Sequence, residues 1–184
     1  MSVVIVDHYD SFTENLVRYV KLHGYSCCLV PYDELVFGDI NASHIILSPG
    51  PKSPRHYPNS LQIISLFKNK LPILGVCLGH QMLGSYFGMQ VKRSQLPAHA
   101  YAKNISLEDS AIFQGLPKSI KVACYNSLVI EAHNSSEMEV IAKCDLNEIM
   151  AIQHEKLPLF GVQFHPESVL TEFGATIIKN FLEC

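Results

Sequence analysis

An apolar stretch that runs directly into a cysteine flanked by glycines is the feature that most restricts the fold of this chain. Residues 71–76 are typical of a short buried strand, Cys77 follows, and a helix-like segment begins at the next residue. Gly75 and Gly79 stand on either side of the cysteine, where neighbouring Cβ atoms would collide in a tight turn. The pattern predicts a nucleophile elbow, in which Cys77 lies at the carboxyl edge of a sheet and a helix N-terminus favours its thiolate.

The alternative interpretation of Cys77 is an inert, buried small hydrophobe, which is what most cysteines are. A Gly-x-Cys-x-Gly run does not by itself separate the two, because short motifs also occur by chance. An active site therefore requires partner residues elsewhere in the chain.

Length and composition indicate a globular protein. The 184 residues suggest one domain, 1–184, with 48% hydrophobic and 17% charged residues. A net charge of −3 without a basic run gives no electrostatic support for nucleic-acid binding. No apolar run approaches membrane-spanning length, so no membrane association is expected.

The cysteines and histidines argue against disulfides and metal. The six cysteines form no C-x-x-C pair, and the start of the chain does not resemble a secretory signal. The nine histidines are scattered without a metal-binding spacing. We therefore expect a reduced, cytoplasmic protein that binds no metal.

The first half of the sequence alternates between strand and helix patterns. Strands are predicted at residues 3–6, 28–30, 44–48 and 73–76. A capping box at residues 11–14 predicts the start of a helix that ends at Gly24, and residues 60–68 form a second helix. This alternation predicts an α/β fold with an open, mostly parallel sheet flanked by helices.

The second half departs from this alternation. Short strands are predicted at residues 91–93, 103–105 and 121–123, which indicates a small antiparallel excursion near one edge of the sheet. Further strands are predicted at residues 138–142, 148–153 and 159–164, and residues 171–182 form a closing amphipathic helix.

The strand at residues 159–164 supplies candidate partners for the cysteine. It leads into His165, and Glu167 follows two positions later. Residues i and i+2 of an extended chain point the same way, so both side chains can project from one strand end. A carboxylate that fixes the imidazole tautomer leaves the other ring nitrogen free to take a thiol proton. A chance pair at a surface strand end is the alternative, but the elbow favours a Cys77–His165–Glu167 triad.

Two other histidines, His80 and His154, are alternative candidates for the base. His80 lies on the helix after the elbow and is expected to point into the protein as a structural residue. His154 also lies near a strand end, but its only neighbouring acid, Glu155, is expected to face away.

An acyl-transfer site also needs donors for an oxyanion. The backbone N–H of Leu78, directly after the cysteine, is one candidate. The loop at residues 48–51 can supply the second, because Gly50 allows close approach of the backbone and the flanking prolines stiffen the loop. A plain tight turn is the alternative for that loop.

Five motifs in order resemble class I (triad) glutamine amidotransferases, and in particular the small subunits of anthranilate synthase and aminodeoxychorismate synthase. They are Asp10-Ser11-Phe12-Thr13 with Asn15-Leu16, Leu47-Ser48-Pro49-Gly50-Pro51, Gly75-Val76-Cys77-Leu78-Gly79-His80-Gln81, Tyr125-Asn126-Ser127-Leu128, and Gly161-Val162-Gln163-Phe164-His165-Pro166-Glu167-Ser168. The resemblance implies a flavodoxin-like fold that hydrolyses glutamine to glutamate and ammonia.

The resemblance also implies roles and partners. Cys77 would be the nucleophile, His165 the base and Glu167 its orienting acid. The glutamine would be bound by Gly50, Pro51, Leu78, Gln81, Ser127 and Leu128. The ammonia would pass to a large, chorismate-binding subunit, which would hold magnesium, whereas this chain would need no cofactor. Whether the product serves tryptophan or folate synthesis is left open.

Three positions depart from the family pattern: Lys52, Asn126 and Ala100-Tyr101. None belongs to the triad, but the last two fall in regions that face the partner or the ammonia route in relatives. Two alternative functions therefore stay open, a non-catalytic regulatory subunit and an amidotransferase of another biosynthetic pathway.

Overall fold

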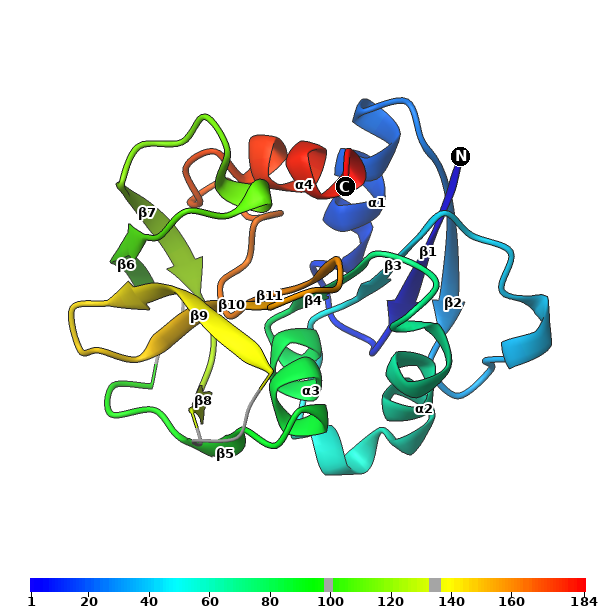
Figure 1. The fold of residues 1–184 in the computed structure, drawn as a ribbon, viewed down its shortest axis with the longest axis horizontal. Coiled ribbons are helices and arrows are strands. Elements are labelled where there is room, and N and C mark those ends of the chain that lie inside the picture. The colour runs from blue at the N-terminus through cyan, green and yellow to red at the C-terminus, as the bar shows by residue number, and fades with distance from the viewer. Residues whose placement is uncertain (98–100, 133–136) are drawn as a thin grey trace.

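The computed structural model describes residues 1–97, 101–132 and 137–184. Within them, nine strands form one sheet in the order β2-β1-β3-β4-β11-β10-β9-β6-β7 (Figure 1). The first five are parallel neighbours: β2 (Ser26–Pro31), β1 (Ser2–Asp7), β3 (His44–Leu47), β4 (Ile73–Val76) and β11 (Leu159–Val162). Four antiparallel strands extend them: β10 (Ile149–His154), β9 (Met138–Cys144), β6 (Tyr101–Leu107) and β7 (Ser119–Cys124).

A separate antiparallel pair consists of β5 (Gln90–Arg93) and β8 (Leu128–Glu131). The predicted fold class, an open mostly parallel sheet flanked by helices, is confirmed. The antiparallel part is larger than the sequence indicated, because it continues the main sheet and does not lie beside it. β8 was not predicted at all.

Helices cover both faces of the sheet (Figure 1). α1 (Thr13–Leu22) and α4 (Gly174–Leu182) lie on one face, and α2 (Pro58–Phe67) and α3 (Leu78–Tyr86) on the other. β1 shows why two layers form, because Val3 and Ile5 pack in the core under α1 and α4, whereas Val4 and Val6 pack in the core on the opposite face. None of the helices in the described part of the chain is long and apolar enough to cross a membrane.

The direction of the strands brings loops from distant parts of the sequence to one edge of the sheet. β1, β3, β4 and β11 are parallel, so their carboxyl ends meet there. From β11 to β7 the direction reverses at each of four antiparallel steps, so β7 also ends at this edge. The antiparallel extension therefore delivers the loop at residues 125–127 to the same edge as Cys77.

The start of α1 differs from the prediction. The helix begins at Thr13, and no side chain caps its N-terminus, so the predicted capping box is wrong. The polar side chains there bind elsewhere: Asp10 Oδ1 accepts from the Phe12 N–H at 2.8 Å, and the Thr13 hydroxyl donates to Asp7 Oδ1 at 3.0 Å. Gly24 follows the helix with φ +82°, as the predicted helix end requires.

The last helix begins at Gly174, three residues later than predicted. Phe173 precedes it in the left-handed conformation, with φ 58°. A Cβ at Gly174 would collide with the carbonyl of Pro166, so the chain approaches the loop after β11 too closely there for any other residue. Because the helix starts later than predicted, Thr171 lies outside it, and its hydroxyl bonds to the backbone of Ala123 and His165.

Candidate active site

Cys77 occupies the predicted strand-to-helix elbow. It follows β4, caps α3, and is 8% exposed. Its φ of 51° and ψ of −97° are unusual for a residue with a side chain, so the strain lies at Cys77 itself and not at its glycines. The glycines provide space: a Cβ at Gly75 would collide with the Gly79 backbone, and one at Gly79 with Leu47.

His165 and Glu167 form a buried pair in the turn after β11. The His165 Nδ1–H donates to Glu167 Oε1 at 2.7 Å. β11 ends at Val162, so the two side chains meet through a turn and not through the extended alternation that the sequence suggested. Burial alone would lower the pKa of His165, but Cys77 and the Glu167 carboxylate raise it well above its ordinary value. His165 Nε2 is buried and has no hydrogen-bond partner among the described residues.

Hydrogen bonds from distant segments hold the His165 backbone. The His165 N–H donates to the Ala123 carbonyl at 3.0 Å, and the Thr171 hydroxyl donates to the His165 carbonyl at 2.6 Å. Thr171 Oγ1 also accepts from the Ala123 N–H at 2.9 Å. The loop after β11 is thereby tied to β7.

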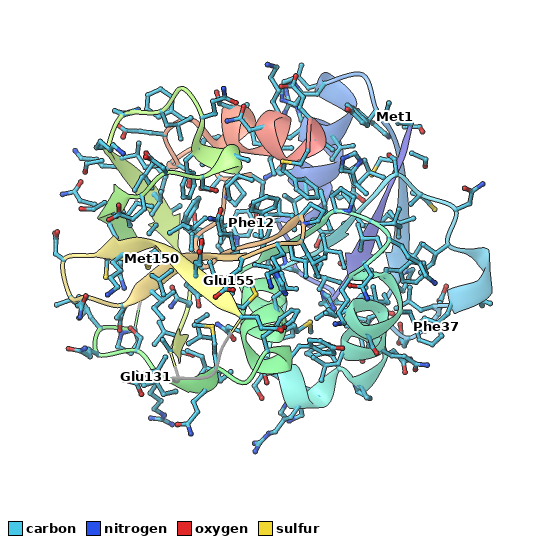
Figure 2. All side chains as sticks on the ribbon, viewed as in Figure 1. Met1, Phe12, Phe37, Glu131, Met150 and Glu155 are labelled. Atoms are coloured by element: carbon cyan, nitrogen blue, oxygen red, sulfur yellow. The ribbon has the colours of Figure 1, made fainter. Side chains whose placement is uncertain are left out.

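Two aromatic rings pack edge-on against the imidazole. Phe12 lies with its ring centroid 5.5 Å from that of His165, and Tyr125 lies at 4.9 Å. Phe12 comes from the loop between β1 and α1 and lies near the centre of the view in Figure 2. These ring contacts restrict the rotation of the imidazole.

The rival histidines are placed elsewhere. His80 is fully buried, with its ring against Gly161, and burial lowers its pKa to about 3, so it is a structural residue as expected. His154 ends β10, which runs antiparallel to β11, so it lies at the edge of the sheet opposite Cys77. Its Nδ1 accepts from the backbone of Lys156 and Leu157.

A glutamine that the sequence pattern did not single out contacts Cys77. Gln163 Nε2 donates to Cys77 Sγ at 3.6 Å, and Gln163 Oε1 accepts from Gln81 Nε2 at 3.1 Å. Gln81 Nε2 also donates to the Leu128 carbonyl at 3.0 Å. Both amide protons of Gln81 are therefore used inside the protein, and only its Oε1 is left for a ligand.

One cavity unites the predicted residues. It has a volume of about 150 Å³ and is lined by Cys77 together with every predicted substrate-binding residue: Gly50, Pro51, Leu78, Gln81, Ser127 and Leu128. Lys52, Tyr125 and Asn126 complete its wall. Of the three departures, Lys52 and Asn126 thus lie at the site, whereas Ala100 lies outside the described residues.

A buried histidine holds the loop that carries Gly50. The His8 N–H donates to Ser48 Oγ at 2.9 Å, His8 Nδ1 lies 3.1 Å from the Ser48 carbonyl, and His8 Nε2 lies 2.8 Å from Ser60 Oγ. Burial lowers the pKa of His8 to about 4, so its ring is neutral at ordinary pH. A Cβ at Gly50 would lie 2.5 Å from that of His8, which explains the glycine.

Sequence reasoning missed four supporting residues: His8, Phe12, Gln163 and Thr171. Phe12 and Gln163 stood inside motifs, but nothing in their spacing indicated what they contact. His8 lies two residues after the predicted strand at residues 3–6, and that position at the carboxyl edge was the one available signal. Within the described residues no group of three or more His, Cys, Asp or Glu side chains could hold a metal ion.

An elbow cysteine beside a buried His–Glu pair is an arrangement that suits nucleophilic acyl transfer. The family model of class-I glutamine amidotransferases matches residues 4–184, and the chain therefore belongs to this family. The fold agrees: a glutamine amidotransferase from Thermotoga maritima superposes with a TM-score of 0.76 at 20% identity, over 100% of this chain and 81% of that one.

The relatives found by sequence similarity carry more specific names than the family does. The chain is 42% identical to anthranilate synthase component 2 of Pseudomonas aeruginosa, over 98% of this chain and 94% of the relative. It is 38% identical to aminodeoxychorismate/anthranilate synthase component 2 of Bacillus subtilis, over 98% and 95%. It is also 41% identical to the bifunctional protein TrpGD of Thermotoga maritima, over 98% of this chain but 32% of that longer protein.

Proposed function

We propose that this chain is the glutaminase component of a synthase that aminates chorismate, with Cys77 as its nucleophile. The observation that carries the proposal is the cavity, where Cys77 meets all six predicted substrate-binding residues, and the buried His165–Glu167 pair supports it. The relatives named as component 2 of anthranilate and aminodeoxychorismate synthases support the choice of acceptor.

The chemistry follows from the geometry. His165 accepts the Cys77 proton, and the sulfur attacks the side-chain amide carbon of glutamine. The tetrahedral intermediate collapses as His165 protonates the leaving nitrogen, which releases ammonia and leaves a thioester. Water then attacks the thioester, with His165 as base, which releases glutamate and regenerates the free thiol of Cys77. Glu167 keeps the Nδ1 proton in place and stabilises the imidazolium.

The elbow and the loop after β3 supply backbone N–H groups that stabilise the tetrahedral intermediate. The Leu78 N–H, at the start of α3, and the Gly50 N–H are the proposed oxyanion donors. His8 fixes the Gly50 loop in advance through Ser48. Gln81 offers its Oε1, and the backbone of Ser127 and Leu128 binds the rest of the glutamine.

The ammonia is proposed to pass to a large subunit that binds chorismate and holds magnesium, while this chain needs no cofactor. The relatives' names cover both anthranilate and aminodeoxychorismate synthases, so the acceptor is either of these two. A cytoplasmic location accords with such biosynthesis.

A covalent probe tests the nucleophile. A chloromethyl ketone analogue of glutamine should alkylate Cys77, detected by intact mass and peptide mapping. Cys28→Ser, at an exposed cysteine, is the matched control and should keep the label, whereas Cys77→Ser should lose it. Labelling that persists in Cys77→Ser would contradict the proposal that Cys77 is the nucleophile.

Reconstitution tests the acceptor. The chain is mixed with each candidate large subunit, chorismate, magnesium and glutamine, and the product is identified as anthranilate or aminodeoxychorismate. If neither mixture releases ammonia from glutamine, the non-catalytic regulatory role replaces this proposal.

A further inference from the structure

Lys52 has a backbone conformation that its residue type does not favour. Its φ is 66°, in the left-handed region where glycine is the ordinary occupant. It follows Gly50 and Pro51 directly, and these two residues line the cavity beside Cys77. A strained, non-glycine residue at the rim of an active site points to a function for its side chain.

The backbone on both sides of Lys52 is held by hydrogen bonds, whereas its ammonium forms no ion pair within the described residues. The Tyr57 hydroxyl donates to the Pro51 carbonyl at 2.9 Å, and the His56 N–H donates to the Ser53 carbonyl at 3.0 Å. Pro54 is buried on the other side of the lysine. The Lys52 side chain itself is exposed, and it takes part in none of the ion pairs formed among the described residues.

Lys52 supplies the formal charge of the cavity wall. Among the described residues that line the cavity there is one lysine and no Asp, Glu or Arg. The Glu167 carboxylate is buried and bonded to His165, so it does not offset the lysine at the rim. An anionic group that enters this cavity therefore meets one unpaired cation.

We propose that the Lys52 ammonium binds the α-carboxylate of glutamine and thereby selects free α-amino acids as substrates. This inference rests on the proposed function and assigns a specificity residue to it. A point charge on a flexible stem suits an exposed carboxylate at the end of the substrate opposite the reacting amide. The lysine does not touch the reacting atoms.

Two probes that differ only in the carboxylate test this assignment. One is the chloromethyl ketone analogue of glutamine with a free α-carboxylate, and the other carries a carboxamide in its place. The rate of Cys77 alkylation per probe concentration is measured by intact mass for the wild type, Lys52→Met and Lys52→Arg. Lys118→Met, at an exposed lysine that lines a different pocket, is the matched control.

Lys52→Met should slow the alkylation of Cys77 by the carboxylate probe about fivefold. The rate of alkylation by the carboxamide probe should not change. Lys52→Arg should keep the preference, and Lys118→Met should behave as the wild type. Raising the salt from about 0.01 M to about 1 M should erode the wild-type preference. Lys52→Gly should lose the preference with an unchanged or higher melting temperature, because glycine suits φ 66°.

Equal slowing of both probes in Lys52→Met and Lys52→Gly, or no slowing of either, would overturn the assignment. If the wild type is alkylated at Cys77 by both probes at the same rate, the carboxylate is not recognised and Lys52 has no such role. If neither probe labels Cys77, the proposed function itself fails.

Discussion

Gly75 and Gly79 touch across the elbow, because the Gly79 backbone fills the space that a side chain at Gly75 would need. The contact joins the end of β4 to the start of α3 around Cys77. The position of Cys77 thus depends on two residues that have no side chain.

Gly75→Ala should therefore displace the elbow. We expect a loss of about 3 kcal/mol in the free energy of unfolding, since backbone atoms have little room to yield. Alkylation of Cys77 by the glutamine analogue should slow in parallel. Urea unfolding and labelling rates measure the two effects.

Gly38→Ala is the matched control, because nothing lies within 4 Å of the added Cβ. It should change the stability by less than about 0.5 kcal/mol. A Gly75→Ala variant as stable as Gly38→Ala would contradict the close contact.

Glu167→Gln should abolish turnover without loss of substrate binding. The neutral amide no longer fixes the His165 tautomer or stabilises the imidazolium, so kcat should fall by about 10⁴ while KM changes little. Steady-state kinetics of ammonia release with the large subunit measures both. A variant with near-normal kcat would remove Glu167 from the triad.

The same variant should show a pH-dependent loss of stability. The pKa of His165 is raised in the folded protein, so the stabilisation of the imidazolium is complete below the unfolded value of about 6.5. It is lost as the pH rises through the raised pKa. The stability deficit of Glu167→Gln should therefore be largest near pH 6 and shrink in alkaline buffer, and a deficit independent of pH would argue against this coupling.

The contribution of His8 to the free energy of unfolding should have the opposite pH dependence and be lost in acid. Its pKa falls to about 4 on folding, so its contribution to stability is complete above about 6.5 and is lost as the pH falls through 4. The full effect is about 3 kcal/mol, and His8→Asn should flatten the acid slope by that order. His80, whose pKa is about 3, keeps part of the slope.

Denaturant unfolding between pH 7 and pH 4 checks this, with His56→Asn at an exposed position as the control. An unchanged slope in His8→Asn would show that His8 is not buried in its neutral form. A lower kcat at pH 7 would report the loss of support for the Gly50 loop.

Glu148 anchors the segment after β5 through a buried ion pair. Its Oε2 accepts from Lys103 Nζ at 3.0 Å, and its Oε1 accepts from the Ser94 hydroxyl and the Gln95 N–H, both at 2.7 Å. Glu148→Gln leaves Lys103 buried without a counter-charge, which should lower the unfolding free energy by about 3 kcal/mol. Chemical denaturation measures this.

Asp109→Asn breaks the exposed pair with Lys118 and is the matched control. It should cause no measurable loss. Equal effects of the two substitutions would show that the Glu148 pair is open to solvent.

Short-range patterns predicted the parts of the fold that depend on neighbouring residues. The buried strands, the helix after Cys77, and the His165–Glu167 pairing all depend on residues within a few positions of each other. The α1 capping box failed because the helix begins at Thr13, so that Phe12 and not Ser11 precedes its first residue. β8 was missed because its partner within the described residues is β5, a strand far from it in the sequence.

The sequence alone determined a cysteine at a strand-to-helix turn and a histidine–glutamate pair close together in the chain, because sterics and hydrogen bonding act over a few residues there. Only the tertiary structure decided what surrounds them. The path of the antiparallel strands places Tyr125 against His165, and the packing of β11 beside β4 places Gln163 on Cys77. Such contacts depend on how distant segments align in the sheet, and no local pattern specifies that alignment.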